Sequence, residues 1–280
     1  MAAGTVVVTG ASTGIGAATC RRLAGLGFDV LAGVRRDEDA ELVESWSGRI
    51  RAVRLDVTDP RDVAALAEGV ASAPVPLAAL VNNAGTAVVG PVEALTVEDW
   101  REQLEVNVLG QVAVTRALLP LLIERRGRVV MMSSVAGRVA GPLFGPYAAS
   151  KFAIEALTDV LRQEVAPHGV SVVAVEPGAI ATPIWERGRV AGDRRWDGVD
   201  PAVEKRYARL VEAVRRLADQ AAREGLPPEA VAEVVGRALT APRPRTRYLV
   251  GKDAVAQAWL GRVLPDRALD ALVRRSLLGG

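Results

Sequence analysis

The sequence predicts an α/β protein with one doubly wound parallel sheet whose helices cover both faces. Short β-branched runs alternate with longer segments in which apolar residues recur at helical spacing. This alternation is typical of repeated strand–helix–strand units, which build parallel sheets with right-handed crossovers. Because 280 residues suit one large α/β domain and are few for two, we expect a single domain over residues 1–280.

The expected strands are short apolar runs, each followed by glycine or polar residues. They lie at 5–8, 29–34, 50–55, 77–81, 128–132, 170–175 and, late in the chain, 246–250. Helical spacing of apolar residues fills the segments between them, most clearly at 16–27, 61–71, 97–125 and 147–169. After Thr182 the alternation stops. A glycine-punctuated excursion is expected there, then helices near 201–223 and 227–240, and a basic helical tail over 252–280.

Composition excludes several classes of protein. Half of the residues are apolar, which excludes a disordered chain, and the net charge of +2 is too small for a nucleic-acid-binding protein. The single cysteine, Cys20, allows no internal disulfide and no cysteine-based metal site. No apolar stretch approaches the length that spans a bilayer, so we expect no transmembrane segment and a cytoplasmic location. The lone histidine, His168, is assigned no chemistry.

The segment TVVVTGASTGIG places glycines at Gly10, Gly14 and Gly16 between the first strand and the first helix. Glycine lets the backbone approach a pyrophosphate closely, and a helix N-terminus offers free N–H groups and partial positive charge. The turn is therefore interpreted as a phosphate cradle, although a glycine-rich turn could merely cap a helix.

Polar or glycine-containing turns follow three other strands. Asp56 follows the third strand, Asn83 and Gly85 the fourth, and Pro177 with Gly178 the sixth. Since ligands of open α/β sheets bind at the carboxyl ends of the strands, these residues are expected to face one crevice. Each could alternatively be an ordinary turn or cap residue.

The motifs TGASTGIG, NNAG, SS before VAG, YAASK and PGAIATP together resemble the classical short-chain dehydrogenase/reductase family over residues 4–185. The resemblance implies a Rossmann-like domain, an NAD(P)(H)-dependent oxidoreductase and a homodimer or homotetramer. It assigns Gly10, Ser12, Gly14, Ile15 and Gly16 to the diphosphate, Asp56 and Val57 to the adenine, Asn83, Ala84 and Gly85 to the adenosine ribose side, and Pro177, Gly178, Ile180 and Thr182 to the nicotinamide end.

The end of the second strand indicates which cofactor is preferred. Members of the family that use NAD usually carry an aspartate at the position of Val34, whereas here Val34 is followed by Arg35 and Arg36. Guanidinium groups suit a 2′-phosphate, so NADP(H) is predicted as the preferred cofactor, with NAD(H) possible. The alternative is a salt-bridged surface cluster, because the acidic run 37–39 follows immediately.

Tyr147 and Lys151 are four residues apart in a helical segment and should project from one helix face. A nearby ammonium is expected to lower the pKa of the phenol, which is near ~10 when free. In the family the lysine also binds the nicotinamide ribose, and the tyrosine is the general acid in reduction and the general base in oxidation.

Two further catalytic residues follow from the resemblance. Ser134 lies thirteen residues before Tyr147, the family's usual interval, and its hydroxyl would hold the substrate oxygen. Asn107 matches the family's catalytic asparagine, which holds a water in a proton relay. The alternative for Asn107 is a structural amide at a helix kink.

Residues 183–225 occupy the place where family members fold a segment over the substrate. Gly188, Gly192 and Gly198 could be hinges, and Trp185 and Trp196 could be apolar walls or could pack in a core or subunit interface. With Val135 and Phe144, Trp185 is expected to form a pocket for an apolar alcohol or carbonyl compound.

The segments TAPRPRTRYLVGKDA and LPDRALDALVRR resemble the branch that contains hydroxysteroid and retinol dehydrogenases. Two alternatives remain from the sequence: a catalytically silent nucleotide-sensing or scaffold protein on the same fold, and a membrane-surface role for the basic tail instead of subunit packing.

Overall fold

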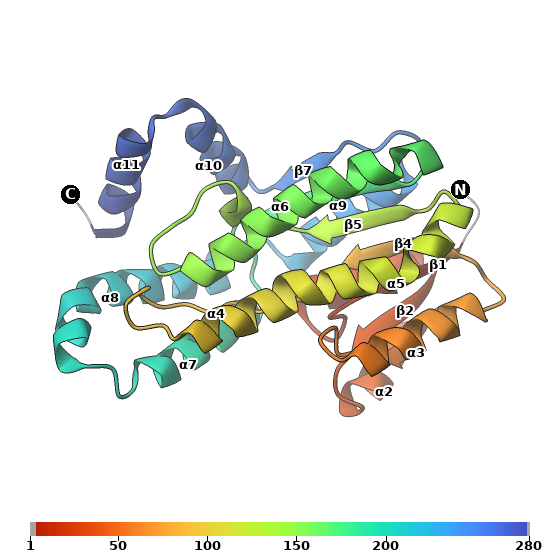
Figure 1. Cartoon of the computed structure of the whole chain (residues 1–280), viewed down its shortest axis with the longest axis horizontal. Helices are drawn as coiled ribbons and strands as arrows, with labels where there is room; N and C mark the ends of the chain where they lie inside the picture. Colours follow the sequence, from red (N-terminus) through yellow and green to blue (C-terminus); the bar gives the residue numbers. More distant parts are fainter. Residues whose placement is uncertain (1–3, 279–280) are drawn as a thin grey trace.

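A computed structural model describes residues 4–278, and its centre is a seven-stranded parallel sheet with the strand order β3-β2-β1-β4-β5-β6-β7 (Figure 1). Every neighbouring pair is parallel. The strands are β1 (Thr5–Val8), β2 (Asp29–Val34), β3 (Ile50–Arg54), β4 (Leu77–Asn82), β5 (Arg128–Met132), β6 (Ser171–Pro177) and β7 (Arg247–Val250). The predicted doubly wound sheet is confirmed, and each expected strand forms with its ends shifted by two residues or fewer.

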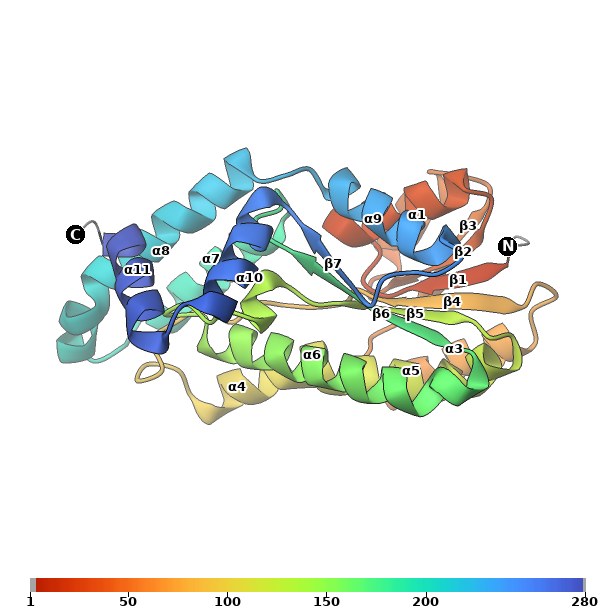
Figure 2. The same ribbon diagram turned by 90° about the horizontal axis from the view of Figure 1, so that it is seen from above.

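Helices cover both faces of the sheet (Figure 2). The first face carries α1 (Gly14–Gly25) and α9 (Pro228–Thr240), and the second carries α3 (Pro60–Ala71), α5 (Gly110–Glu124) and α6 (Gly145–Val165). The other helices are α2 (Glu38–Glu44), α4 (Val97–Leu104), α7 (Ile184–Trp196), α8 (Pro201–Glu224), α10 (Lys252–Val263) and α11 (Asp266–Leu278), with short turns η1 (Glu105–Leu109), η2 (Val135–Gly137) and η3 (Ala166–His168).

Two apolar cores result from the alternation of side chains along the strands. In β1, Val6 and Val8 pack on the α1 and α9 side, and Val7 packs on the other side. All three are fully buried. Cys20 lies in the first core, where burial raises the pKa of its thiol to about 12, so it serves there as a small buried apolar residue.

The helical run Val97–Glu124, made of α4, η1 and α5, is long and apolar enough to cross a membrane by length and composition. From the sequence, no apolar stretch of such a length was expected. Here Val114, Leu118 and Leu122 of this run are fully buried in the second core, so the sheet accounts for its apolar character.

The segment after β6 differs from the expected excursion because it contains helix α7. Gly188 and Gly192, expected as hinges, lie inside this helix. A Cβ at Gly188 would come 3.6 Å from the Ala87 carbonyl oxygen, and one at Gly192 would come 3.5 Å from the Val89 carbonyl oxygen. These glycines therefore allow α7 to pack on the 87–89 loop. Gly198 has a positive φ of 88° and is the position suited to a turn.

The C-terminal tail forms two helices that fold back onto the same chain. Helix α10 follows β7, and α11 packs against α8 (Figures 1 and 2). Residues 279–280 of the predicted tail lie outside the described residues. The tail thus lies on the side of the sheet to which the carboxyl ends of the strands point (Figure 1).

Candidate active site

A cavity of about 1960 Å³ lies beyond the carboxyl ends of the strands. This is the position expected for ligands of an open parallel sheet, beside the switch in strand order between β1 and β4. The cavity collects residues that follow each of the seven strands. With the exception of Gly16, every residue predicted for catalysis, cofactor or substrate lines it.

The glycine turn after β1 forms one wall of the cavity. Gly10 and Gly14 have positive φ angles of 63° and 55°, which favour glycine. A Cβ at Gly10 would lie 2.8 Å from the Ala84 Cα, so a side chain there would clash with the backbone. Helix α1 begins at Gly14, and no side chain caps its first N–H groups. The turn therefore presents free backbone donors to the cavity, with Ser12 and Ile15 beside them.

Gly16 does not line the cavity, and its contact with the diphosphate stays a prediction. Its hydrogen lies against the inside of the turn, where a Cβ would come 2.2 Å from the Gly10 carbonyl oxygen. Asn83 holds this turn from the neighbouring strand end. Its Nδ2 donates to the carbonyl oxygens of Thr9 and Gly10, both at 3.0 Å. Glycine at position 16 is thus required by packing within the turn.

The two arginines after β2 differ in their surroundings. Arg36 makes ion pairs with Glu38 and Asp39, each at 2.8 Å, so the salt-bridged alternative describes this residue. Arg35 also lines the cavity, and among residues 4–278 it forms no ion pair. Asp39 lines the cavity as well, close to Ser12. The end of β2 therefore offers one unengaged guanidinium and one paired guanidinium.

Asp56 and Val57 follow β3 and line the same part of the cavity. Asp56 also has the turn role considered from the sequence, because its Oδ1 accepts from the backbone N and the hydroxyl of Thr58, at 2.9 and 2.7 Å. Val57 is buried. Ala84 and Gly85, after β4, complete this wall.

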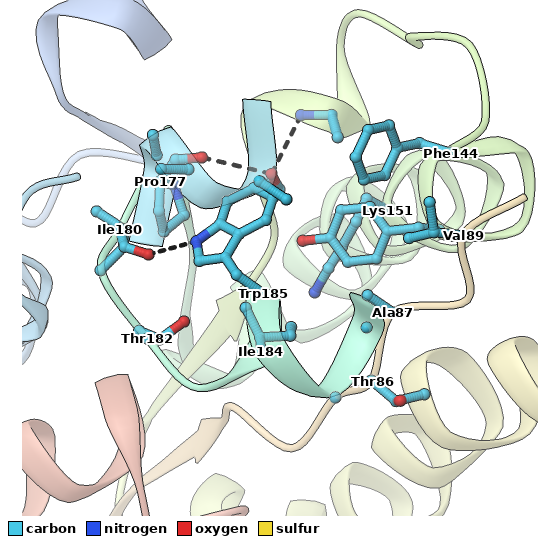
Figure 3. Close-up of a pocket in the computed structure, with 18 of the residues that line it drawn as sticks. Thr86, Ala87, Val89, Phe144, Lys151, Pro177, Ile180, Thr182, Ile184 and Trp185 are labelled. Carbon is cyan, nitrogen blue, oxygen red and sulfur yellow. Dashed lines mark hydrogen bonds between the residues drawn. The ribbon is translucent and has the colours of Figure 1, made fainter. Parts of the chain in front are cut away.

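Ser134, Tyr147 and Lys151 come together where β5 meets α6. The Ser134 hydroxyl accepts from the Ala136 backbone N at 3.2 Å and donates to the Pro177 carbonyl at 3.4 Å. The Lys151 Nζ lies 5.7 Å from the centre of the Tyr147 ring. In Figure 3, Lys151 points into the space between Trp185 on one side and Phe144 and Val89 on the other.

Lys151 is buried, and its Nζ donates to the Met132 carbonyl oxygen at 2.8 Å. Burial of an ammonium group is costly unless it is paired with hydrogen-bond acceptors or opposite charge. Met132 ends β5, so this bond ties the α6 lysine to the strand that leads into Ser134.

Asn107 lies in η1, a π-helical turn between α4 and α5, and is fully buried. Its Oδ1 accepts from the Thr86 backbone N at 2.8 Å, and its Nδ2 donates to the Thr86 carbonyl and the Ser150 hydroxyl, both at 3.1 Å. Ser150 in turn donates to the Tyr147 carbonyl at 2.7 Å. Asn107 thus holds the backbone after β4 against the start of α6, and it also lines the cavity.

The loop after β6 forms the wall opposite Lys151. Asp253, in the first turn of α10, accepts from the Ala179 backbone N at 2.7 Å. A Cβ at Gly178 would come 2.1 Å from the Asp253 Oδ2, so glycine is required there. Ile180 accepts from the Trp185 indole at 2.6 Å, and Thr182 lies against Gly14. The loop therefore joins the glycine turn to α7.

The predicted substrate residues surround the same opening. Phe144 and Val89 lie on one side of it, and Trp185 lies on the other beside Pro177 and Ile180 (Figure 3). The Phe144 and Tyr147 rings meet edge to face with centroids 6.4 Å apart. Val135 is buried at the start of η2 and also lines the cavity. Apolar groups thus enclose the hydroxyl-bearing residues.

A family model described as short chain dehydrogenase matches residues 4–190. The chain belongs to the short-chain dehydrogenase family. It is accordingly an oxidoreductase that acts on CH–OH or C=O groups with NAD(P).

Curated relatives of this short-chain dehydrogenase match it along nearly all of its length. An NADPH-dependent 3-dehydrocapnine reductase of Ornithobacterium rhinotracheale is 36% identical over 97% of this chain and 96% of the relative. Retinol dehydrogenase 5 of Mus musculus is 39% identical over 96% of this chain and 87% of the relative. The predicted likeness to the hydroxysteroid and retinol dehydrogenase branch is confirmed.

Solved structures of short-chain dehydrogenases have the same fold. One from Streptomyces avermitilis has a TM-score of 0.80 and 33% identity and covers 98% of this chain and 96% of its own. One from Burkholderia cenocepacia, in complex with NADP, has a TM-score of 0.74 and 27% identity and covers 98% of each chain.

The electrostatics of the tyrosine in this short-chain dehydrogenase differ from the sequence expectation. Burial raises the pKa of Tyr147, and the neighbouring Ser134 hydroxyl opposes that shift only in part. Burial also lowers the pKa of Lys151 to about 8, against the attraction of Glu155. The expected lowering of the phenol pKa by the ammonium is therefore wrong for this structure, and Tyr147 remains a neutral phenol at pH 7.

Three charged residues near the site were missed from the sequence. Asp253 positions the 178–180 loop, as described above. Arg187 of α7 lines the cavity, and its positive charge lowers the pKa of Asp39 across it. Glu176, fully buried in β6, accepts from the Arg138 Nε and Nη2 at 2.5 and 2.8 Å. The available signal for Glu176 was an acidic residue directly after the apolar run 170–175.

Proposed function

We propose that this short-chain dehydrogenase uses NADP(H) to interconvert an apolar alcohol and its ketone or aldehyde, with Tyr147 as general acid and base. The observation that carries the proposal is the meeting of Ser134, Tyr147 and Lys151 in the cavity that also contains the glycine turn. The cavity thus contains three groups that the reaction needs. The Ser134 hydroxyl would hold the substrate oxygen, the Tyr147 phenol would exchange a proton with it, and the Lys151 ammonium lies beside the phenol.

The cavity fits a dinucleotide by the form of its walls. Glycine at positions 10 and 14 lets the turn lie close to Ala84 and Thr182, and the uncapped start of α1 supplies backbone donors for a diphosphate. Asp56 and Val57 would border the adenine, and Asn83, Ala84 and Gly85 the adenosine ribose. Pro177, Gly178, Ile180 and Thr182 would border the nicotinamide, which supplies or accepts the hydride.

The chain's own residues would move the proton. In reduction, the neutral phenol of Tyr147 donates its proton to the carbonyl oxygen while Ser134 donates a hydrogen bond to that same oxygen. In oxidation, Tyr147 takes the proton from the alcohol. Lys151 would bind the ribose and, when charged, favour the phenolate that donation leaves behind. Asn107 would hold a water that returns protons to Lys151.

Arg35 supports the preference for NADP(H). It carries a guanidinium without an ion pair among residues 4–278, at the strand end that would meet the 2′-position. Guanidinium groups bind phosphate through paired charge-assisted hydrogen bonds. The relative from Ornithobacterium rhinotracheale is NADPH-dependent, which agrees with this preference. NAD(H) is the weaker cofactor in this proposal.

The apolar substrate is supported by Val135, Phe144 and Trp185 around the opening. We also propose a homodimer or homotetramer in the cytoplasm.

A cofactor and substrate panel tests the proposed function. Binding of NADPH and NADH is measured by fluorescence, and a series of apolar aldehydes, ketones and alcohols is then followed by absorbance of the reduced cofactor. We expect tighter binding of NADPH and turnover of apolar carbonyl compounds. Cofactor binding without turnover across the panel would instead favour the catalytically silent nucleotide-sensing protein.

A further inference from the structure

The cavity extends beyond the residues assigned to the cofactor and to catalysis. Its volume of about 1960 Å³ compares with roughly 300–1,000 Å³ for ordinary ligand pockets. Part of its lining lies away from the glycine turn, on α8, α10 and α11. We call this part the distal channel. Its apolar lining residues are Val211, Val214, Leu217 and Ala218 of α8, Leu260 of α10, and Leu269, Leu272, Val273 and Leu277 of α11.

The α11 side of the distal channel is one face of a helix. Leu269, Leu272 and Val273 follow the i, i+3, i+4 spacing, and Leu277 continues it. None of residues 266–277 is buried. An amphipathic helix usually buries its apolar face against a core. In α11 that face lies beside α8 and lines the cavity while it stays incompletely buried, so the helix forms a wall of the channel.

The α8 side has the same character. Leu217 is 44% exposed, although it faces the cavity that Leu272, itself 41% exposed, faces from α11. Arg215 is a polar member of this wall, and Asp193 pairs with it at 2.6 Å. Two rows of incompletely buried aliphatic side chains therefore line this part of the cavity. The polar side chains of Gln220 and Glu224 on α8 and of Ser276 on α11 also border it.

The distal channel is continuous with the catalytic opening. Val214 and Ala221 of α8 line the same cavity as Trp185 and Tyr147. The residues of α11 that line the cavity run from Leu269 to Leu277, so the helix walls the channel over about 12 Å at 1.5 Å per residue. A ligand whose oxygen lies at Ser134 and Tyr147 could thus extend along this wall.

We propose that the distal channel binds the tail of an extended aliphatic substrate whose reacting carbonyl or hydroxyl group is at one end. The proposal rests on the proposed function, because the tail is located relative to Ser134 and Tyr147. Aliphatic rather than polar tails are indicated, since the tail would replace water against leucine, valine and alanine side chains from three helices.

A chain-length series tests this proposal. Alkan-2-ones and alkanals of increasing length are reduced with NADPH by the whole protein, and kcat/KM is measured for each. Burial of one more methylene contributes up to about fourfold in kcat/KM, which is about 0.8 kcal/mol converted at 1.36 kcal/mol per tenfold. We expect kcat/KM to rise with chain length until the channel is filled. A flat series with active short ketones would overturn the channel proposal and leave the proposed function intact.

Val273→Glu places a charge in the channel wall. We expect it to reduce the gain per methylene for long substrates by at least half and to leave short ketones unchanged within about twofold, because an aliphatic tail against the carboxylate would displace its water. Val263→Glu is the matched control, since Val263 is 50% exposed on α10 and does not line the cavity. Ala218→Trp, which fills the channel from α8, should shorten the preferred chain.

The outcomes of the variant experiment separate a failure of the channel proposal from a failure of the proposed function. Retention of the full length dependence by both Val273→Glu and Ala218→Trp would overturn the proposal. Equal loss in Val273→Glu and Val263→Glu would also overturn it, because the effect would then not depend on the channel. Absence of turnover for every carbonyl compound, long or short, would contradict the proposed function itself. Activity toward short ketones shows that each variant is folded.

Discussion

The Arg36 guanidinium donates two hydrogen bonds to the Asp39 carboxylate, from Nη2 at 2.8 Å and from Nε at 3.1 Å. This pairing raises the pKa of Arg36 and lowers the pKa of Asp39. Ser12 and Arg187 act on the same carboxylate. Asp39 is therefore an internal anion at the end of β2, where a cofactor phosphate would compete for Arg36. Arg35 has no such competitor among the described residues.

Arg35→Ala should weaken NADPH binding about tenfold or more and change NADH binding by less than about twofold. Charge-assisted hydrogen bonds to phosphate contribute about 1.5–3 kcal/mol, and NADH lacks the 2′-phosphate. Dissociation constants from cofactor fluorescence measure the effect at fixed ionic strength. Arg51→Ala, on the exposed surface of β3, is the control. Equal weakening of both cofactors would contradict the role of Arg35.

Asp39→Asn should strengthen NADPH binding about fivefold, because it removes a negative charge near the phosphate and frees the Arg36 guanidinium. The same titrations measure this change. NADH binding should be unchanged, since no 2′-phosphate profits from the freed arginine. Weaker NADPH binding in Asp39→Asn would mean that Asp39 holds Arg36 in the orientation that binds phosphate.

Tyr147→Phe should lower turnover about 10²–10⁴-fold while the affinity for NADPH changes by less than about twofold. The substitution removes the exchangeable proton and keeps the ring that meets Phe144 edge to face. Steady-state kinetics and cofactor titration measure the two quantities separately. Tyr207→Phe is the matched control because the Tyr207 hydroxyl donates to Glu93 at an exposed site. Unchanged turnover in Tyr147→Phe would refute the assignment.

The elements with strong local patterns were predictable from sequence. The strands alternate with helices of clear periodicity, and the glycine turn, Ser134, Tyr147 and Lys151 each lie at a strand end or on a regular helix. Their convergence follows from parallel topology, because the carboxyl ends of all strands meet at one edge. The residues of the cavity wall were thus predictable from strand order and local motifs, and no knowledge of contacts between residues distant in sequence was needed.

Features that depend on long-range packing were not predictable. Helix α7 was missed because its glycines resemble hinges until the 87–89 loop lies against them. Asp253 acts on a loop 74 residues earlier in the chain. The raised pKa of Tyr147 depends on how much protein surrounds the phenol, and local spacing of Tyr147 and Lys151 shows only that they share a helix face.

Arg138→Ala should destabilise the protein by about 2 kcal/mol and reduce turnover. The substitution breaks the ion pair between Arg138 and the fully buried Glu176. Glu176 then keeps only Arg247, whose Nε lies 3.3 Å from its carboxylate. Breaking a buried ion pair is costly because it leaves a buried charge without a partner. Arg138 follows the η2 turn that begins after Ser134, so the serine should also lose its fixed position. Urea denaturation measures stability. Arg162→Ala, which breaks a more exposed pair with Asp159, should cost less than about 1 kcal/mol.

Equal destabilisation by Arg138→Ala and Arg162→Ala would contradict the importance of the buried carboxylate. A stability loss in Arg138→Ala with full turnover would show that Ser134 is positioned without the ion pair. The two measurements thus separate the structural role of Glu176 from its effect on the catalytic loop.

Lys151→Met should abolish most activity and, near neutral pH, increase the free energy of unfolding by about 1 kcal/mol or more. Burial lowers the pKa of Lys151 from its ordinary value of 10.5 to about 8 in the folded protein. Below pH 8 the lysine is charged in both states, so the folded state bears the full cost of the buried charge. Between pH 8 and 10.5 the folded state releases its proton first, and the cost declines with rising pH.

The stability gain of Lys151→Met over the wild type should therefore be largest at about pH 7 and smaller at about pH 10. Urea denaturation at both pH values measures it. Lys205→Met, at an exposed position on α8, is the control and should show no pH-dependent difference. Loss of the hydrogen bond to the Met132 carbonyl acts in the opposite direction at both pH values, so the change in the difference between them is the decisive quantity. A gain that does not decline toward pH 10 would contradict a charged, buried Lys151 in the folded enzyme.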